Sequence, residues 1–508
     1  MTAKAPNILI VMADQMAPAF LPIHGHPRTR APHMQALAER GVVFESAYCN
    51  SPLCAPSRAS FMTGRLPSST RVYDNAAEFS ADIPTFAHCL RIRGYRTILS
   101  GKMHFCGPDQ LHGFEQRLTT DIYPADYGWT PDWDHPERRP TWYHNMRSVV
   151  QAGVCVRTNQ LDFDDEVAFT AERAIFDSAR SKDRRPFLLV ASFSHPHDPF
   201  LAPQRYWDLY RDSDIDMPAR AIAPDALDPH TRRLRHVSAM DAEPVTDAEA
   251  RNARHAYYGA ISYIDDHLGR LIGTLRSAGL AEDTIVVLTS DHGEMLGERG
   301  LWYKMSFFEG ACRVPLVVAN PDRFTPRRVA SSVSLVDLFP TLIDISGGDA
   351  LSLGTSIDGR SLGAQLHGKA GHDEAIGEYL AEGAIAPVVM IRRGAFKFIH
   401  SAPDPDQLFD LKRDPGEHEN LAGKEQCAAF VADFRTEIGR RWDLGELDRQ
   451  VRESQRRRRL VDAALNIGEI RAWDFQPFRD AARQYIRNSG ALDDLEAMAR
   501  FPPVGPRI

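Results

Sequence analysis

The sequence has no long hydrophobic run near its start and no excess of basic residues. The longest early apolar run, Ile8 to Ala13, ends at Asp14 and is too short for a signal peptide or a membrane span. The chain has 60 Lys and Arg against 68 Asp and Glu, a net charge of −8, with both signs mixed along it. Such a chain lacks the electrostatic footprint that a nucleic-acid backbone requires. We therefore expect a cytoplasmic protein with neither a membrane nor a nucleic acid as partner.

Cysteine is scarce and irregularly placed. The chain has seven cysteines, an odd number without C-x-x-C spacing: Cys49, Cys54, Cys89, Cys106, Cys155, Cys312 and Cys427. This pattern indicates neither a disulfide framework nor a zinc site. A cysteine with a function here would act through its reactivity.

Short β-branched runs alternate with helical patterns up to about residue 345, which is typical of a parallel sheet covered by helices on both faces. The expected strands are Ile8 to Ala13, Val42 to Tyr48, Tyr95 to Ser100, Phe187 to Phe193, Thr284 to Thr289 and Pro315 to Ala319. The expected helices are Pro32 to Arg40, Thr85 to Arg93 and Ala250 to Ala278, each followed by a glycine suited to a helix end, Gly41, Gly94 and Gly279.

The length suggests roughly three units at about 150 residues each, and the pattern divides accordingly. Residues 1–347 form the predicted catalytic α/β domain, which includes a long ordered loop from Asp121 to Asn145. Residues 348–423 form a smaller α+β domain, with strands expected at Val388 to Arg392, Phe396 to His400 and Gln407 to Leu411. Residues 424–508 form a charged helical extension with a tail. We interpret its run Arg456 to Arg459 as a solvated helix face.

Polar residues follow several of the expected strands. They are Asp14 and Gln15, Lys102 and His104, His195 and His197, and Asp291 and His292. The carboxyl ends of parallel strands share one edge of a sheet, so these groups should converge on one crevice. Asp14 and Asp291 offer oxygen atoms to a hard divalent cation, and His292 adds a nitrogen ligand. The alternative is that Asp14 caps the next helix and Asp291 lies in a turn.

The sharpest motif is Cys54-Ala55-Pro56-Ser57-Arg58, followed by Thr63-Gly64-Arg65. Pro56 is acceptable in the first turn of a helix, which would place Cys54 near the helix N-terminus, where an anion is favoured. Arg58 would then lie close to whatever Cys54 attacks. The alternative is a buried, inert thiol.

This motif resembles the C-x-P-S-R signature of the type I sulfatases of the alkaline phosphatase superfamily. The resemblance spans residues 6 to about 420 and continues at Asp14, Lys102-x-His104, His197-Asp198-Pro199, Asp291-His292-Gly293, Lys304, Glu309-Gly310 and Arg313-Val314-Pro315. It implies a large mixed, mostly parallel sheet sandwiched by helices, with a smaller C-terminal α+β domain and a helical C-terminal extension. It also implies that a formylglycine-generating or other sulfatase-maturating enzyme oxidises Cys54 to formylglycine.

The resemblance further implies roles for single residues. The catalytic residues would be Cys54, Arg58, Lys102, His104, His197 and Lys304, and the ligands of one divalent metal ion would be Asp14, Gln15, Cys54, Asp291 and His292. His197, beside Lys304, would be the general acid, and His104 the base that regenerates the aldehyde. Many sulfatases have Asp at position 15 and Asn at 292. Ca²⁺ is the family default, and this departure leaves Mg²⁺ and Mn²⁺ open.

The loop after Asp121 is rich in aromatic residues, namely Tyr123, Tyr127, Trp129, Trp133, Trp142 and Tyr143. Aromatic faces and nearby carboxylates recognise a quaternary ammonium, although core packing is the alternative use of these side chains. Several stretches, among them residues 13–18, 74–79, 100–110 and 123–129, resemble choline sulfatases, a branch of the same superfamily. By that resemblance Trp129 would face a trimethylammonium group, with Asn75, His144 and Glu382 nearby.

The sequence therefore predicts hydrolysis of choline-O-sulfate to choline and sulfate. The same resemblance implies a homo-oligomer, a dimer or tetramer, in which Asp493 or Asp494 contributes to the partner's cation site. A first alternative is a phosphonate monoester or phosphodiester hydrolase, because those enzymes carry the same Asp-Gln and Asp-His pairs. A second is a non-catalytic choline-ester binding protein in which Cys54 remains a thiol.

Overall fold

Continuous apolar runs form the centre of the main sheet. The computed structural model describes residues 5–219, 222–223, 226–348 and 356–468. Its largest sheet has the strand order β10-β2-β9-β8-β1-β6-β3-β4. The bounds are β1 Asn7–Ala13, β2 Gly41–Tyr48, β3 Arg96–Gly101, β4 Gln116–Arg117, β6 Phe187–Phe193, β8 Thr284–Ser290, β9 Arg313–Ala319 and β10 Arg327–Ser334. Every residue of β1, β6 and β8 is buried, as expected for strands covered on both faces.

The sheet is mixed but mostly parallel, as predicted. Strand β9 runs antiparallel to its neighbours β8 and β2, and the other neighbouring pairs are parallel. The six strands expected from the sequence all belong to it. The parallel strands β1, β3, β6 and β8 therefore bring their carboxyl ends to one edge.

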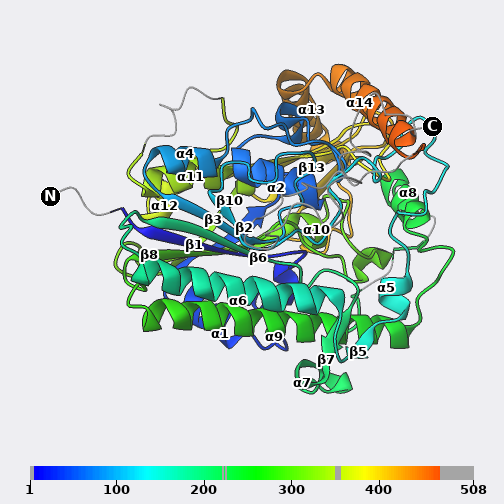
Figure 1. Cartoon of the computed structure of the whole chain (residues 1–508). Helices are drawn as coiled ribbons and strands as arrows, with labels where there is room; N and C mark the ends of the chain where they lie inside the picture. Colours follow the sequence, from blue (N-terminus) through cyan, green and yellow to red (C-terminus); the bar gives the residue numbers. More distant parts are fainter. Residues whose placement is uncertain (1–4, 220–221, 224–225, 349–355, 469–508) are drawn as a thin grey trace, which may run out of the picture. The chain divides into compact units, whose positions relative to one another are not determined.

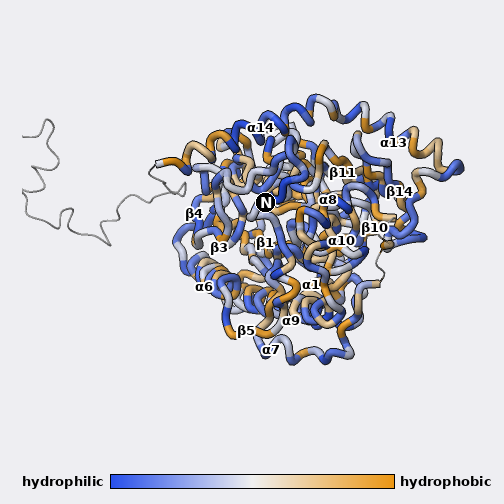
Figure 2. The backbone as a smooth tube through the Cα atoms, turned by 90° about the vertical axis from the view of Figure 1, so that its right-hand side faces the viewer, coloured by the Kyte–Doolittle hydropathy of each residue, from blue (hydrophilic) through white to orange (hydrophobic). Residues whose placement is uncertain are grey.

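Helices cover both faces of this sheet (Figure 1). One face carries α1 (Pro32–Ala38), α6 (Asn159–Arg180) and α9 (Asp247–Ser277), and the other carries α2 (Cys54–Thr63), α4 (Phe86–Ile92) and α11 (Leu338–Ile345). The view in Figure 2 shows β1 and β3 between α6 and α9 below and α14 (Leu444–Leu465) above. The shorter elements are α3 Pro67–Thr70, α5 Arg147–Val150, α7 Gln204–Trp207, α8 Pro229–Val237, α10 Glu309–Cys312, α12 Gly363–Leu366, β5 Gly153–Cys155 and β7 Leu201–Pro203.

Two of the three predicted helix-ending glycines adopt the left-handed conformation. Gly94 has φ +84° and Gly279 has φ +67°, as expected after a helix. Gly41 does not: it begins β2, where an added Cβ would lie 2.8 Å from the Cβ of Ala319 on β9. The prediction that Gly41 ends a helix was therefore wrong. Its missing side chain serves strand pairing instead.

The smaller sheet is an antiparallel meander of β11 (Glu374–Tyr379), β12 (Val388–Arg393), β13 (Phe396–His400) and β14 (Gln407–Asp410). The sequence predicted the last three strands and missed β11. The helices α13 (Ala428–Arg441) and α14 follow. The described residues belong to one compact unit. The division into three domains remains a prediction.

The interpretation of Arg456 to Arg459 as a solvated face was wrong for one residue. Arg456, Arg457 and Arg459 are exposed, but Arg458 is only 6% exposed and forms an ion pair with buried Asp74. Helix periodicity turns this arginine toward the protein while its neighbours face outward.

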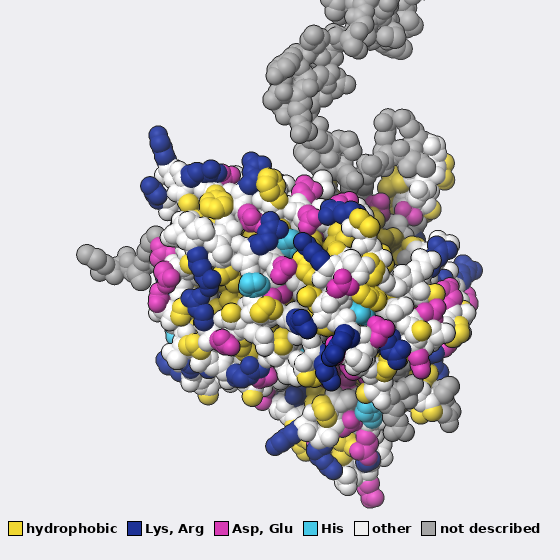
Figure 3. All heavy atoms as spheres, turned by 90° about the horizontal axis from the view of Figure 1, so that it is seen from below, with side chains coloured by type: hydrophobic (Ala, Val, Ile, Leu, Met, Phe, Trp, Pro, Cys, Tyr) yellow, Lys and Arg dark blue, Asp and Glu magenta, His cyan; other side chains and the backbone are white. Residues whose placement is uncertain are grey.

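The surface charge agrees with the composition. On the face shown in Figure 3, Lys and Arg are interspersed with Asp and Glu, without a patch of one sign among the coloured residues. Within the described ranges, every helix is too short or too polar to cross a bilayer. Asp493 and Asp494 lie outside the described residues.

Candidate active site

The polar residues predicted to converge do so at the carboxyl edge of the main sheet. Asp14 directly follows β1, and Asp291 and His292 directly follow β8. One ligand atom from each of these residues and the Cys54 sulfur all lie within 4.8 Å of one another. All four residues are buried. Neighbouring parallel strands thus bring together groups that are far apart in the sequence.

Cys54 is the first residue of α2, the position that the motif predicted. Its Sγ lies 3.3 Å from His292 Nε2 and 3.6 Å from Lys102 Nζ. Burial opposes ionisation of the thiol, but Lys102, Lys304 and His292 together hold its pKa well below the ordinary value. The free N–H groups at the helix N-terminus act in the same direction. The surroundings of residue 54 therefore favour an anion.

The Arg58 side chain is enclosed by protein next to Cys54 and does not face solvent. It is fully buried, and its guanidinium donates to Asp291 Oδ2 at 2.8 Å and to Asp14 Oδ2 at 2.9 Å. It also donates to the Lys102 carbonyl at 2.5 Å. Arg58 thus fixes two predicted metal ligands and the turn that carries Lys102.

The donor set at the sheet edge fits a hard divalent cation. Asp14 and Asp291 provide carboxylate oxygens, and His292 Nε2 lies 3.8 Å from Asp14 Oδ1 and 3.7 Å from Asp291 Oδ2. Burial and the nearby Cys54 raise the pKa of Asp14, but Lys102, His197 and Arg58 outweigh them and hold it well below the usual range. The carboxylate is therefore ionised, as a metal ligand must be.

Gln15, the fifth predicted ligand, uses its side chain elsewhere in this structure. Its Oε1 accepts a hydrogen bond from Lys304 Nζ at 2.6 Å, and its Nε2 donates to Glu294 Oε2 at 2.5 Å. Burial raises the pKa of Glu294 to about 7. Gln15 thereby connects the predicted metal site with Lys304, and its role as a ligand remains a prediction.

Lys304 and His197 form a pair on the wall next to Cys54. Lys304 Nζ lies 2.7 Å from His197 Nε2, and His197 Nδ1 lies 2.6 Å from the Asp198 carbonyl oxygen. A carbonyl oxygen can only accept, so Nδ1 carries a proton and donates to it, and Nε2 is left to share a proton with Lys304. Burial lowers the pKa of Lys304, but Cys54, Asp198 and Asp14 raise it above the ordinary value. Lys304 therefore keeps its charge beside the His197 imidazole.

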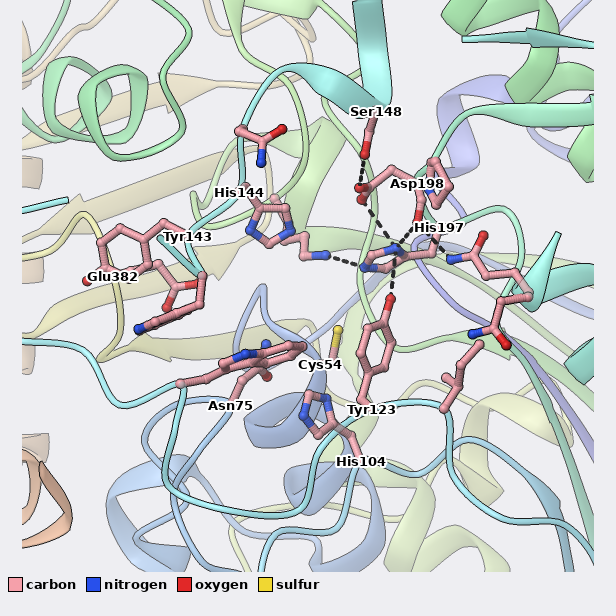
Figure 4. A pocket seen from close by; sticks show the side chains of 18 of the residues that line it. Cys54, Asn75, His104, Tyr123, Tyr143, His144, Ser148, His197, Asp198 and Glu382 are labelled. Atoms are coloured by element: carbon pink, nitrogen blue, oxygen red, sulfur yellow. Dashed lines mark hydrogen bonds and ion pairs between the residues drawn. The ribbon is translucent and has the colours of Figure 1, made fainter. Parts of the chain in front are cut away.

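A cavity of about 390 Å³ opens beside these groups, and its wall includes Cys54, His104, His197 and Lys304. In Figure 4, Asn75, Tyr143 and Glu382 lie to one side of Cys54, and His197, Asp198 and Ser148 lie to the other. Neither ring nitrogen of His104 is in hydrogen-bonding geometry with another described residue, although the ring contributes to the lowered pKa of Cys54. His104 is therefore available to a bound molecule.

The aromatic side of the cavity consists of Asn75, Trp129, Trp142, Tyr143 and Glu382. Trp129 and Trp142 have nearly parallel rings, with centroids 6.4 Å apart, and Tyr143 meets Trp142 edge-on. Burial raises the pKa of Glu382 to about 7. Indole faces and a carboxyl group in one cavity wall can together attract an organic cation.

The structure shows which of several neighbouring polar and aromatic residues line the cavity, a distinction that the sequence did not allow. His195 Nδ1 lies 2.7 Å from Asp164 Oδ2 and not at the cavity, whereas His197 lines it. Trp133 also does not line this cavity: it is buried, and its indole N–H donates to the Ala381 carbonyl. His144 lines the cavity as predicted, and burial and Lys304 lower its pKa to about 3, so it is neutral.

Several residues that line the cavity were not predicted as site residues, among them three that contact His197 or Asp198. Tyr123 OH lies 3.3 Å from His197 Nδ1, Ser148 donates to Asp198 Oδ2 at 2.8 Å, and Gln160 donates to the Asp198 carbonyl at 2.7 Å. Tyr123 and Asp198 belong to motifs named in the sequence analysis, residues 123–129 and His197-Asp198-Pro199, so they could have been predicted as site residues. Ser148 and Gln160 follow an irregular loop, and no sequence pattern distinguishes them.

Protein-family profiles identify the family to which this chain belongs. The profile of the sulfatase family matches residues 6–348. The chain belongs to the sulfatase family. Two C-terminal profiles of sulfatases also match, "choline sulfatase enzyme C terminal" at residues 449–501 and "N-sulphoglucosamine sulphohydrolase, C-terminal" at residues 297–442. Membership in this family implies a formylglycine at residue 54 and a divalent metal ion.

This sulfatase has relatives of different specificity. It is 48% identical to a choline-sulfatase of Rhizobium meliloti (strain 1021) over 99% of both chains. It is 30% identical to human iduronate 2-sulfatase over 68% of this chain and 70% of that one. Among solved structures, the phosphonate monoester hydrolase of Agrobacterium radiobacter is 26% identical with a TM-score of 0.69, covering 88% of this chain and 96% of that one.

Proposed function

We propose that this sulfatase hydrolyses choline-O-sulfate to choline and sulfate. The observation that carries the proposal is a single cavity with two unlike sides. One side holds Cys54 among Lys102 and Lys304, which suits a sulfate, and the other holds Trp129 and Glu382, which suits a trimethylammonium group. The full-length similarity to a choline-sulfatase supports the same substrate.

Two groups would complete the site. Asp14, Asp291, His292 and residue 54 would hold one divalent ion, with Gln15 as a further ligand. We propose Ca²⁺, with Mg²⁺ and Mn²⁺ as alternatives. Such an ion, when bound, polarises a sulfuryl oxygen. A formylglycine at residue 54 would supply the nucleophilic oxygen, as a hydrated aldehyde.

The surrounding residues would stabilise charge and hold the sulfate in line. Lys102 Nζ lies close enough to residue 54 to contact a bound sulfate oxygen. Arg58 keeps Asp14 and Asp291 in position through its two short hydrogen bonds. Transfer of a sulfuryl group resembles transfer of a phosphoryl group, in which positioning and charge stabilisation provide most of the catalysis.

Protons would move at two histidines. Choline is an alkyl alcohol and a poor leaving group, so its departure requires a general acid. The proton that His197 Nε2 shares with Lys304 lies on the cavity wall and would pass to the leaving oxygen. His104, on the other side of Cys54 in Figure 4, would act as the base that regenerates the aldehyde.

The proposal is tested with matured enzyme, choline-O-sulfate, phosphocholine and 4-nitrophenyl sulfate. We expect the highest kcat/KM for choline-O-sulfate. Mass spectrometry should find aldehyde instead of thiol in the peptide that holds Cys54, and unmodified thiol in the peptide that holds Cys106, the internal control. Full activity in a preparation with only thiol at residue 54 would refute the formylglycine mechanism. Absence of choline-O-sulfate turnover in aldehyde-bearing enzyme would refute the substrate.

A phosphonate monoester or phosphodiester hydrolase is the second candidate, because the similar solved structure has that activity and tetrahedral oxyanions are alike in shape. This second candidate predicts that Trp129→Ala leaves kcat/KM for choline-O-sulfate almost unchanged. Our proposal predicts that Trp129→Ala lowers kcat/KM for choline-O-sulfate about 30-fold, since a desolvated cation–π contact contributes about 2 kcal/mol. Trp207→Ala, at a half-buried indole stacked on His255, is the matched control.

We also propose that a sulfatase-maturating enzyme acts on Cys54 and that the protein is a cytoplasmic homo-oligomer, a dimer or tetramer. Light scattering of the full chain tests the assembly. Expression with and without a maturating enzyme tests the modification, with the mass of the Cys54 peptide as the readout. A monomer in the first experiment, or complete conversion without the partner in the second, would contradict these proposals.

A further inference from the structure

Helix α14 holds the loop that carries the aromatic side of the cavity. Arg452 donates to the carbonyl oxygens of Trp133 at 2.8 Å and Ile385 at 2.6 Å. Gln455 Oε1 accepts a hydrogen bond from the Trp133 backbone N–H at 3.0 Å. In Figure 1 the helix lies beside α13 at the top of the view. The contacts join the C-terminal part of the described chain to a loop more than three hundred positions earlier.

Helix α14 also forms a buried ion pair, between Arg458 and Asp74. Nη1 donates to Asp74 Oδ1 and Nη2 to Asp74 Oδ2, both at 2.7 Å, and Nη1 also donates to Thr130 Oγ1 at 3.1 Å. Asp74 is fully buried and Arg458 is 6% exposed. A bidentate arginine–carboxylate pair, with two parallel hydrogen bonds, fixes both groups in orientation as well as in distance.

Besides Ser454 on its own helix, Arg458 contacts Asp74 and Thr130, and each of these two directly adjoins a residue of the aromatic side. Asp74 precedes Asn75, and Thr130 follows Trp129. Asn75 Oδ1 in turn accepts a hydrogen bond at 2.9 Å from the backbone N–H of Ala55, the residue after Cys54. One guanidinium group thus connects two cation-side residues, and through Asn75 it reaches the first turn of α2.

We infer that Arg458 is a positioning residue for recognition of the substrate's cation, an inference that rests on the proposed function. Without the guanidinium, the buried Asp74 carboxyl loses its charged partner, so the segments around Asn75 and Trp129 must shift or admit water. The sulfate side depends on other contacts, those of Arg58, Asp14 and Asp291. The effect should therefore be larger on the cation side than on the sulfate side, which Arg458 reaches indirectly, through Asn75 and Ala55. The choline sulfatase C-terminal profile begins at residue 449 and includes Arg458.

Arg457 offers a matched control on the same helix. Its side chain is 65% exposed and pairs with Glu453 one turn away. We expect Arg458→Gln to raise KM for choline-O-sulfate about tenfold or more, while kcat/KM for 4-nitrophenyl sulfate, which has no trimethylammonium group, stays within about twofold. Arg457→Gln should change neither. Arg458→Lys should recover part of the loss, because it restores charge without the bidentate geometry.

A second variant keeps the test valid if Arg458→Gln folds poorly. In Asp74→Asn/Arg458→Gln no buried charge is left unpaired, so the fold should recover while KM for choline-O-sulfate stays high. Equal losses on both substrates in this double variant would show a merely structural role and overturn the inference. An unchanged KM in either variant would overturn it as well.

A readout without substrate separates this inference from the proposed function. Amide hydrogen exchange in residues 127–134 should accelerate about tenfold in Arg458→Gln and not in Arg457→Gln. Wild-type enzyme that fails to hydrolyse choline-O-sulfate would refute the proposed function, whatever the exchange rates are. Unchanged exchange in a folded Arg458→Gln variant would refute the positioning role, whatever the substrate is.

Discussion

Glu382 shows how a single side chain relates the proposed substrate to pH. It is 4% exposed and lines the aromatic side of the cavity, and burial raises its pKa to about 7. Lys304 lies at the same cavity and stays charged because its own pKa is raised. Near neutral pH the cavity therefore keeps a fixed positive charge on its sulfate side and a titrating negative charge on its cation side.

The raised pKa of Glu382 predicts a pH-dependent KM. Below about pH 7 the carboxyl is protonated and neutral, so it attracts a trimethylammonium weakly; above that pH it is ionised. KM for choline-O-sulfate should therefore fall as pH rises through about 7. Glu382→Gln should remove this step and give a high, flat KM. A wild-type KM that rises through the same interval, or a step that survives in Glu382→Gln, would contradict the assignment.

Residues on named motifs were predictable, and those fixed by distant contacts were not. Cys54, Asp14, Asp291 and His292 follow strands or begin a helix, so strand order alone brings them together. The ion pair of Arg458 with Asp74 joins residues 384 positions apart, and no local pattern indicates it. The run of four arginines suggested a solvated face because composition does not tell which member of the run points inward.

Elements with a continuous buried sequence were predicted well, and edge elements were missed. Strands β1, β6 and β8 are buried along their whole length, which gives uninterrupted apolar runs. Strand β10 lies at the sheet edge with alternating exposure and reads as arginine, serine and alanine between a few valines. Strand β11 contains a glycine and two glutamates. Both segments form strands because they pair with neighbouring strands, and their intrinsic β-propensity contributes less.

At the end of β3, Gly101 permits the backbone approach that places Lys102. It has φ +112°, and a Cβ added there would lie 1.9 Å from the Ser192 carbonyl oxygen on β6. Gly101→Ala should lower the free energy of unfolding by more than about 4 kcal/mol, through strain and a clash with backbone. Gly94→Ala, also at positive φ but with open space around it, should cost only about 1–2 kcal/mol. Urea unfolding measures both, and equal losses would show that conformation alone matters.

The smaller sheet is joined to α10 by a largely buried charged cluster as well as by apolar packing. Lys397 on β13 is fully buried and pairs with Glu309 on α10 at 3.0 Å and with Glu417 at 2.5 Å. Burial opposes its charge, but Glu309 and Glu417 help to raise its pKa above the ordinary value. The smaller sheet is thereby fixed to the segment that follows Lys304, so its attachment affects the active site.

Removal of Lys397 should therefore destabilise the whole described unit. In Lys397→Met the buried carboxylate of Glu417 and the partly buried one of Glu309 lose their partner, and we expect a loss of about 3–5 kcal/mol in the free energy of unfolding. Lys424→Met, which removes an exposed ion pair with Glu419, should cost at most about 1 kcal/mol. Circular dichroism and tryptophan fluorescence should report one coincident transition in each. Two separate transitions in Lys397→Met would instead indicate that the small sheet detaches first.

The central claim is that one cavity binds a sulfate and the positive charge of choline together. The most direct measurement compares choline-O-sulfate with 3,3-dimethylbutyl sulfate, which has the same shape but a carbon atom in place of the cationic nitrogen. We predict that kcat/KM favours choline-O-sulfate by about 30-fold or more, the value of a desolvated cation–π contact of about 2 kcal/mol. Equal kcat/KM values for the two esters would show that the aromatic side recognises shape alone, and would contradict the account.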